Sequence, residues 1–285
     1  MLDIFGGDRI GRRLHRRAAA AMPKLSETEK QALEAGDAGW DAELFTGRPD
    51  WRALLARPRP DFTEVERAFF DGPCARLCGM IDDWDMTWRR GDLPPEVWRF
   101  LREERFFGMI IPEAHGGLGF SSFAQSEVVR RISTRSIAAG VTVMVPNSLG
   151  PGELLLQYGT EAQRDHWLPR LADGREIPSF ALTSEEAGSD AASMVDEGLV
   201  VREGRETLGL RITWRKRYIS LAPRATVLGL AFRLRDPDGL LGGAEDRGIT
   251  LALIPTDAEG VTVGRRHIPC MQPFLNGPTQ GAGVF

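Results

Sequence analysis

The sequence FALTSEEAGSD, residues 180–190, is the stretch that decides how this chain is interpreted. A short apolar segment leads into the hydroxyl residue Thr183, and the turn that follows contains Ala187, Gly188 and Ser189. Small residues in a turn leave backbone N–H groups open to a ligand, because no bulky Cβ substituent covers them. The pattern therefore predicts a strand followed by a loop that presents backbone donors to a planar ligand.

A second segment, KRYIS at residues 216–220, complements the first. It is typical of a β-strand, in which Tyr218 and Ser220 lie two residues apart and so share one face. An aromatic ring can contact the face of a planar ligand, and a hydroxyl can hydrogen-bond to its edge. The two segments together predict one binding site for such a ligand.

Both segments resemble the acyl-CoA dehydrogenase family, whose pattern is close to L-T-E-P-x-A-G-S-D followed by a strand with aromatic-Ile-Thr/Ser. The chain is most similar to the long bacterial fatty-acyl-CoA dehydrogenases of β-oxidation, over their N-terminal and middle domains only. The resemblance implies an oxidoreductase with FAD as cofactor. Its reaction would be α,β-dehydrogenation of a medium- to long-chain acyl-CoA to the trans-2-enoyl-CoA.

The resemblance also assigns residues to the site. Tyr218 stands where the family has Trp, and Ser220 stands where the family has the Thr whose hydroxyl reaches flavin N5. Ser184 and Glu185 replace the family's Glu-Pro, which removes a ring that stiffens the turn. The implied cofactor-binding residues are Phe180, Leu182, Thr183, Gly188, Tyr218, Ile219 and Ser220. The implied substrate-binding residues are Ser189, Asn147 and Leu149.

In the family, the glutamate that removes the Cα proton belongs to a C-terminal helical domain. This sequence ends at Phe285, where the resemblance is still within the last strand of the middle domain. We therefore expect the base to lie beyond Phe285, no catalytic residue in this chain, and no activity from the chain alone. Two alternatives stay open: a non-catalytic module that binds flavin or acyl-CoA, and an acyl-CoA oxidase or flavin monooxygenase on the same scaffold.

The pattern of apolar and polar residues changes at about residue 178. Before it, Thr63-x-x-Glu66 is a capping box and Pro94 to Arg105 has helical spacing of apolar residues. After it come short alternating runs, which predict strands at 208–214, 218–221, 226–234, 250–254 and 261–263.

These patterns predict an α+β fold. An N-terminal extension with a basic helix and a linker occupies residues 1–60, and an all-α helical domain occupies 61–178. A small antiparallel β-barrel domain, truncated at its last strand, occupies 179–285. The predicted fold does not include the C-terminal helical bundle that the family has.

Charge and cysteine content exclude some classes of function. The net charge of −4 argues against a nucleic-acid-binding protein. Cys74 and Cys78 have helical spacing but no matching Cys or His pair, so we expect no metal site. The Gly-rich turn at 115–119 lacks the spacing of a dinucleotide-binding loop and the lysine of a P-loop.

The N-terminus is rich in arginine between Arg9 and Arg17. A basic helix at this position has two interpretations: it lies on an anionic membrane surface, or it is a helix end whose charges are solvated. The expected location is cytoplasmic, with peripheral contact to the inner membrane through this segment. The resemblance further implies an acyl-CoA substrate, an electron-transferring flavoprotein as electron acceptor, and a homo-oligomer in the full-length form.

Overall fold

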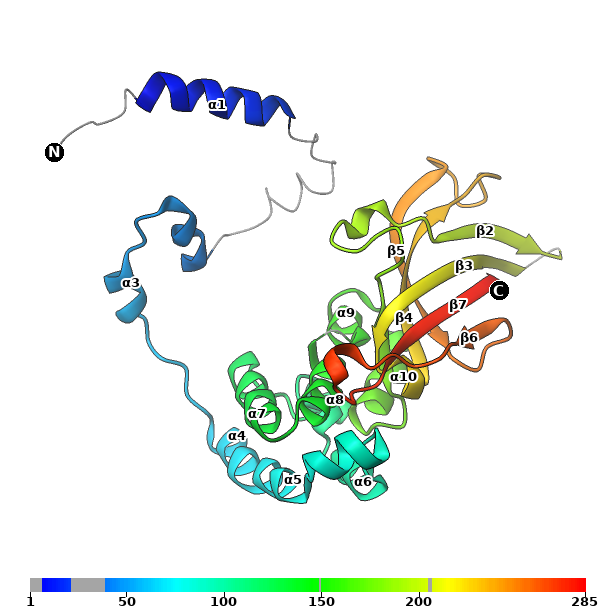
Figure 1. Ribbon diagram of the computed structural model, residues 1–285. Coiled ribbons are helices and arrows are strands. Elements are labelled where there is room, and N and C mark those ends of the chain that lie inside the picture. Colours follow the sequence, from blue (N-terminus) through cyan, green and yellow to red (C-terminus); the bar gives the residue numbers. More distant parts are fainter. Residues whose placement is uncertain (1–6, 22–38, 149, 205–206) are drawn as a thin grey trace. The chain divides into compact units, whose positions relative to one another are not determined.

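The computed structural model describes residues 7–21, 39–148, 150–204 and 207–285, in two units that divide after Arg59. The first unit contains α1 (Gly7–Ala21), the 3₁₀ helix η1 (Trp40–Thr46) and α3 (Trp51–Leu55). Helix α1 contains the arginine-rich stretch from Arg9 to Arg17 (Figure 1). Among the residues described, no helix is both long and apolar enough to cross a bilayer.

The second unit begins with helices (Figure 1). They are α4 (Glu64–Phe69), α5 (Ala75–Met80), α6 (Pro95–Glu103), α7 (Ser122–Arg135), α8 (Ile137–Ser148), α9 (Pro151–Tyr158) and α10 (Glu161–Ala172). The π-helix η2 (Phe70–Cys74) joins α4 to α5, and a second π-helix is η3 (Asp85–Arg90). Short 3₁₀ turns η4 (Phe106–Gly108) and η5 (Glu113–His115) lie between α6 and α7.

The predicted capping box at Thr63 is confirmed. The Thr63 hydroxyl accepts a hydrogen bond from Glu66 N at 3.3 Å, and Glu66 Oε2 accepts one from Thr63 N at 2.8 Å. The other carboxylate oxygen, Oε1, accepts a hydrogen bond from Ser121 N at 2.7 Å. Glu66 therefore caps α4 and also ties it to the start of α7.

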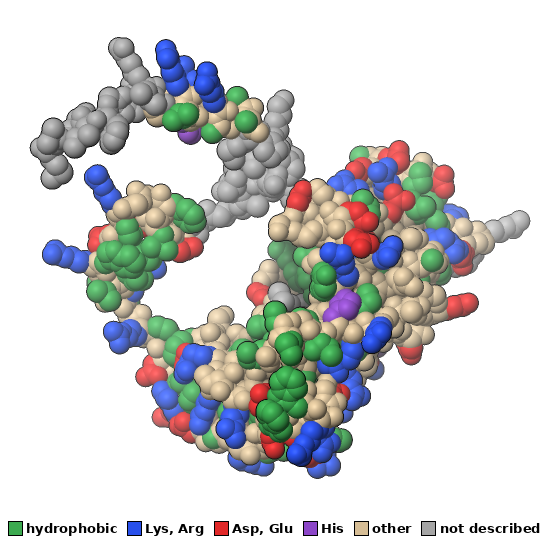
Figure 2. Space-filling model, in the orientation of Figure 1, with side chains coloured by type: hydrophobic (Ala, Val, Ile, Leu, Met, Phe, Trp, Pro, Cys, Tyr) green, Lys and Arg blue, Asp and Glu red, His purple; other side chains and the backbone are tan. Residues whose placement is uncertain are grey.

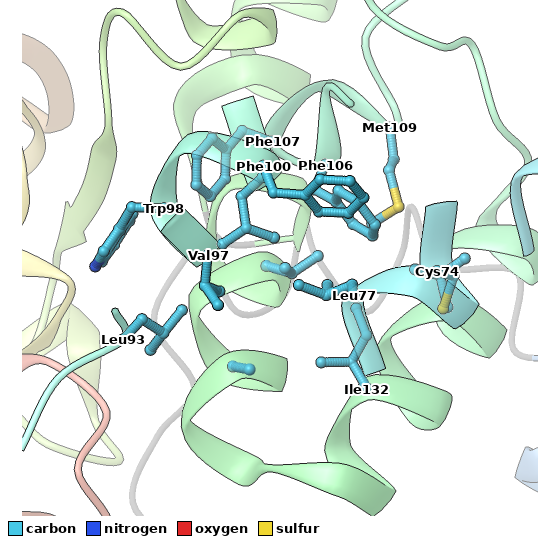
Figure 3. Close-up of a cluster of buried hydrophobic side chains, with 14 of the residues drawn as sticks. Cys74, Leu77, Leu93, Val97, Trp98, Phe100, Phe106, Phe107, Met109 and Ile132 are labelled. Carbon is cyan, nitrogen blue, oxygen red and sulfur yellow. The ribbon is translucent and has the colours of Figure 1, made fainter. Parts of the chain in front are cut away.

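The helices enclose an aromatic-rich core (Figure 3). Its members come from several elements and point toward one another, among them Phe100 of α6 with Phe106 and Phe107 of η4. Two residues of the β part, Leu221 and Leu275, are buried in the same cluster. The helical and β parts of the second unit therefore share one core.

The Gly-rich turn at 115–119 serves the packing of this core. A Cβ on Gly117 would overlap the carbonyl of Ile111, so only glycine fits there. Gly116 and Gly119 have φ of 80° and 62°, the left-handed region that glycine adopts without strain. This turn is explained by backbone geometry and close packing.

The second half of the unit is a single sheet of seven strands. They are β1 (Pro178–Ala181), β2 (Glu197–Glu203), β3 (Thr207–Ser220), β4 (Val227–Arg235), β5 (Asp246–Pro255), β6 (Val261–Val263) and β7 (Asn276–Val284). The strand order is β1-β4-β2-β3-β7-β6, and β5 pairs with β4 along its other edge (Figure 1).

The predicted order, a helical part followed by a β part, is confirmed. The sheet is curled and mixed, whereas the sequence predicted antiparallel pairing throughout. Strands β1 and β2 both run parallel to β4, at Val227–Leu230 and Arg233–Arg235 respectively, and the other pairings are antiparallel. Among the strands described, no pairing closes the sheet into a complete barrel.

Strand β3 also differs from the expectation. The sequence predicted two strands separated at residues 215–217, but β3 is continuous across them. The pattern is broken by three basic residues, and the middle one, Lys216, has a side chain that solvent does not reach. A buried partner for Lys216, described below, explains why the strand continues.

Candidate functional site

The two segments singled out in the sequence lie side by side. Arg217 N donates a hydrogen bond to Thr183 O at 3.0 Å, and Ser184 pairs with Lys216 in an antiparallel bridge. The loop that follows β1 is thus held directly on β3. The structure therefore brings Thr183 to the end of the strand that carries Tyr218 and Ser220.

A buried ion pair anchors this junction. Lys216 Nζ is bonded to Asp196 Oδ2 and donates a hydrogen bond to Leu182 O at 2.9 Å. Asp196 Oδ1 accepts one from Arg215 N at 2.8 Å, and the main chain of Asp196 accepts one from Arg233 N at 2.8 Å. Burial lowers the pKa of Lys216, while the hydrogen bond and charge of Asp196 act to raise it. The pair joins the loop at Leu182 to strands β3 and β4.

A β-bulge sets the direction of Tyr218. Along β3 the buried positions are Ile212, Trp214 and Lys216, and the register against β7 then shifts between Lys216 and Ile219. After the shift Ile219 is buried and Tyr218, which simple alternation would have put in the core, is 55% exposed.

The bulge requires an unusual backbone at Tyr218, with φ of 58°. A non-glycine residue held in the left-handed region costs free energy, and such residues cluster at functional sites. The ring has two close neighbours: the Arg217 guanidinium carbon is 4.8 Å from its centroid, and the His267 ring centroid is 5.2 Å away. The bulge thus presents an aromatic ring on the outer surface.

Polar side chains line the strand beside this ring. Asn276 of β7 pairs with Ser220 of β3, and its Nδ2 lies 3.0 Å from Tyr218 O and 3.4 Å from Ser220 Oγ. Asn276 Oδ1 lies 3.2 Å from His267 Nδ1. Sequence reasoning assigned neither Asn276 nor His267 to the site, because their proximity to Ser220 comes from strand pairing over a long separation.

The loop at 183–190 is shaped by its own short contacts. Ala187 N donates to Ser184 Oγ at 3.2 Å, and Ser184 N donates to Ala187 O at 3.1 Å. Gly188 and Ser189, which follow this turn, are exposed. No atom lies within 4 Å of where a Cβ on Gly188 would be, and its φ is outside the left-handed region. The fold itself therefore does not require glycine at 188.

The remaining predicted site residues lie in different environments. Leu182 packs against Ala187, Met194 and Ala231, and Ile219 is buried in the sheet core, so Ile219 can meet a ligand only through its backbone. Phe180 lines a cavity of about 520 Å³ between α9, α10 and strands β4 and β5.

Of the predicted substrate contacts, Ser189 is exposed on the loop. Asn147 is buried in α8, where its Nδ2 donates to Phe106 O at 2.7 Å and Val143 O at 2.8 Å, and its Oδ1 accepts from Ile110 N at 3.3 Å. Its amide therefore secures α8 in the helical core, and its role with substrate stays a prediction. Leu149 lies outside the described residues.

The hydroxyls, the aromatic ring and the open turn of the two segments fit a flavin. Among the residues described, none forms a hydrogen bond with the Thr183 hydroxyl, so this group is free for a ligand. Tyr218 offers an exposed ring, Ser220 a hydroxyl, and Gly188 an opening that a Cβ would narrow. On the face in Figure 2, acidic and basic side chains are interspersed over the second unit. Face contact, edge hydrogen bonds and open backbone are what an isoalloxazine needs from a protein.

Two family models match the second unit. Residues 63–175 match the model for the N-terminal domain of acyl-CoA dehydrogenases, and residues 179–272 match the model for their middle domain. The first match contains the helices of the second unit, and the second contains both segments of the candidate site.

Curated relatives cover most of the chain. The probable acyl-CoA dehydrogenase FadE10 of Mycobacterium tuberculosis is 29% identical over 87% of this chain and 38% of its own length. The human mitochondrial very long-chain specific acyl-CoA dehydrogenase is 35% identical over 60% of this chain and 26% of its own. The chain thus spans less than two-fifths of the length of these relatives.

Solved structures share the fold. Butyryl-CoA dehydrogenase from Megasphaera elsdenii superposes with a TM-score of 0.68 at 19% identity, covering 80% of this chain and 58% of the other. The glutaryl-CoA complex of glutaryl-coenzyme A dehydrogenase gives 0.66 at 23% identity, over 80% and 56%. An FAD complex of PigA gives 0.66 at 19% identity, over 80% and 57%.

Proposed function

The chain belongs to the acyl-CoA dehydrogenase family, and we propose from this that residues 180–190 and 216–220 form the flavin-binding part of an FAD-dependent acyl-CoA dehydrogenase. One observation carries the proposal: the hydrogen bond from Arg217 N to Thr183 O joins the two segments into one surface. That surface combines an aromatic face, two hydroxyls and an open glycine turn.

The chain's own residues have distinct roles in this proposal. Thr183 and Ser220 hydrogen-bond to the polar edge of the flavin ring, and Tyr218 covers part of its face. The turn at Gly188 lets the ligand approach the backbone closely. Bound there, FAD supplies the acceptor for the hydride that leaves Cβ of the substrate.

The proposed reaction converts an acyl-CoA thioester into its trans-2-enoyl form. The proposed acyl group is medium- to long-chain, and a relative described as very long-chain specific supports the long end of this range. Phe180 belongs both to the flavin segment and to a cavity with a largely apolar lining, so an apolar group in that cavity would lie against the flavin segment. Ser189, exposed beside Gly188, is the proposed contact for the substrate.

The proposal assigns the role of general base to neither Glu185 nor Glu186, because one carboxylate is ion-paired and the other faces water. Glu185 forms ion pairs with Arg217 at 3.2 Å and Arg215 at 3.8 Å. Glu186 is exposed. The acceptor of the electrons is proposed to be an electron-transferring flavoprotein, and the enzyme to act as a homo-oligomer, as the resemblance implies.

Substitution of Gly188 tests the proposed flavin site. We expect Gly188→Val to weaken FAD binding at least about ten-fold, because the branched side chain fills the space that the ligand needs, a loss of about 1.4 kcal/mol. The melting temperature of the FAD-free protein should stay unchanged, because a Cβ at 188 meets no atom of the chain. Calorimetric titration with FAD and thermal melting measure the two effects.

Gly79→Val is the matched control, since Gly79 is an equally open glycine in helix α5. It should leave FAD binding unchanged. Wild-type affinity in Gly188→Val, or a wild-type protein that does not bind FAD, would contradict the proposed function.

A further inference from the structure

We propose that His267 and Asn276 are positioning residues that hold the Ser220 hydroxyl as a hydrogen-bond donor toward the bound flavin. The inference rests on the proposed function and deepens it. It follows from the direction in which each hydrogen bond of a short chain must run, from His267 through Asn276 to Ser220.

The side-chain amide of Asn276 has one allowed orientation. One end of the amide lies 3.0 Å from the carbonyl oxygen of Tyr218, which can only accept a hydrogen bond. An amide oxygen there would place two acceptors in contact, so this end must be Nδ2. Asn276 is 4% exposed, and water is therefore a poor substitute for these partners.

The orientation of Asn276 fixes the proton on His267. With Nδ2 facing Tyr218, the amide oxygen Oδ1 faces His267 Nδ1 at 3.2 Å. An amide oxygen accepts only, so Nδ1 must carry the hydrogen, and in the neutral ring Nε2 is then unprotonated. A backbone hydrogen bond from His267 N to Asn276 O, at 2.7 Å, keeps the two residues together.

The last member of the chain is Ser220. Asn276 Nδ2 also points at Ser220 Oγ, at 3.4 Å, so a lone pair of the hydroxyl is directed at this donor. The Ser220 hydrogen cannot point back at an N–H group and must seek an acceptor elsewhere. Among the residues described, no acceptor receives it. The hydroxyl is left to donate to a ligand that carries an acceptor atom at its edge, as an isoalloxazine ring does.

This arrangement orders the Ser220 hydroxyl, which Ser220 alone would not achieve. A free serine hydroxyl rotates among several positions and both donates and accepts. A hydroxyl whose lone pair faces a fixed N–H group is ordered before the ligand arrives, which reduces the entropy that binding costs. His267 contributes by fixing the amide that does this.

Substitutions of His267 test the relay by FAD titration and by the flavin absorption spectrum. His267→Leu should weaken FAD binding about five-fold, the loss of one hydrogen bond, and should shift the flavin absorption band in the same direction as Ser220→Ala should. His267→Asn should behave as wild type, because its Nδ2–H group lies where imidazole Nδ1–H lies. His267→Gln, whose amide nitrogen mimics Nε2 instead, should resemble His267→Leu.

A double variant shows whether His267 acts through Ser220. In a Ser220→Ala background, His267→Leu should produce no further loss of affinity and no further spectral shift. Additive effects, or an equal loss in His267→Asn and His267→Leu, would overturn the relay.

The tautomer can be measured without FAD, by ¹⁵N NMR of the His267 ring in the free protein. The relay requires hydrogen on Nδ1, and a neutral ring protonated on Nε2 overturns it whether or not FAD binds. A wild-type protein with the expected tautomer that fails to bind FAD overturns the proposed function, and with it the assignment of a flavin to Ser220.

Discussion

At the scale of single residues, Lys216 connects the fold to the candidate site. Its side chain is fully buried, and its ammonium group binds Asp196 and the carbonyl of Leu182. A buried charge is tolerated only when it is paired and hydrogen-bonded, and removing one partner leaves the other charged and unsatisfied. We therefore infer that the main role of the pair is to hold the loop in place. Its net contribution to the free energy of unfolding is the smaller effect, whereas the loss of one partner alone is costly.

We expect Lys216→Met to lower the free energy of unfolding by about 3–5 kcal/mol, because Asp196 is left charged and buried. The double variant Lys216→Met/Asp196→Asn should recover most of this loss, since the amide is neutral and still accepts from Arg215 N. Urea unfolding of the three proteins measures the effect. A single variant as stable as wild type, or a double variant no better than the single, would contradict this reading.

The residue scale also shows what sequence reasoning can reach at the site. Thr183, Tyr218 and Ser220 were found because their chemistry lies within two short local patterns, and the structure brings them together. Asp196 and Asn276 were missed, because a side chain that serves another residue from a distant strand leaves no local pattern. The roles of all the site residues in ligand binding stay predictions.

At the scale of elements, Glu66 links two helices. Although burial raises the pKa of Glu66, hydrogen bonds from Thr63 and Ser121 lower it more, and the net pKa is below the ordinary value of 4.5. A carboxyl with a lowered folded pKa stabilises the fold fully above its unfolded pKa. This contribution is lost as the pH falls through the lower pKa of the folded state.

Glu66→Gln should therefore destabilise the protein by about 1–3 kcal/mol at pH 7, the cost of weakening hydrogen bonds to a charged group. The difference from wild type should be smaller in acid, because the contribution is lost as the pH falls from the ordinary value of 4.5 through the lowered pKa of the folded carboxyl. Glu64→Gln, an exposed change in the same helix turn, is the control and should have little effect at either pH. Urea unfolding at both pH values decides, and a pH-independent difference would contradict the account.

Elements were predictable where local signals define them. The capping box at Thr63, the apolar spacing in α6 and the short strand β6 follow from residues close together in sequence. The parallel pairing of β1 and β2 with β4 was not predictable, because it depends on which strands meet after long connections. The bulge at Tyr218 was missed for a related reason: it reverses the two-residue alternation on which the prediction of β3 relied.

At the scale of the whole second unit, the helical and β parts are joined by packing. Leu221 and Leu275 are buried in the helical core, and Val227 of β4 packs with Leu168 and Leu171 of α10. An ion pair between Arg224 and Asp92, at 3.0 Å, also connects the two parts. Because the two parts bury apolar surface against each other, we expect them to unfold together.

We therefore expect residues 60–285 to unfold in one cooperative transition by calorimetry. Leu275→Ala should cost about 2–5 kcal/mol, the usual range for a large-to-small change in a core, and should lower the stability of both parts together. Leu251→Ala, at a 45% exposed position in β5, is a control that should cost much less. Two separate transitions, or a Leu275→Ala effect confined to the β signal, would contradict a shared core.

The central claim is that the loop at 180–190 and the strand end at 216–220 form one flavin site. Hydrogen–deuterium exchange of the protein with and without FAD tests it most directly, because it reports on each segment separately. The account predicts that FAD slows exchange in both segments together and leaves the surface of α4 unchanged. Protection of only one segment, or of neither, would contradict it.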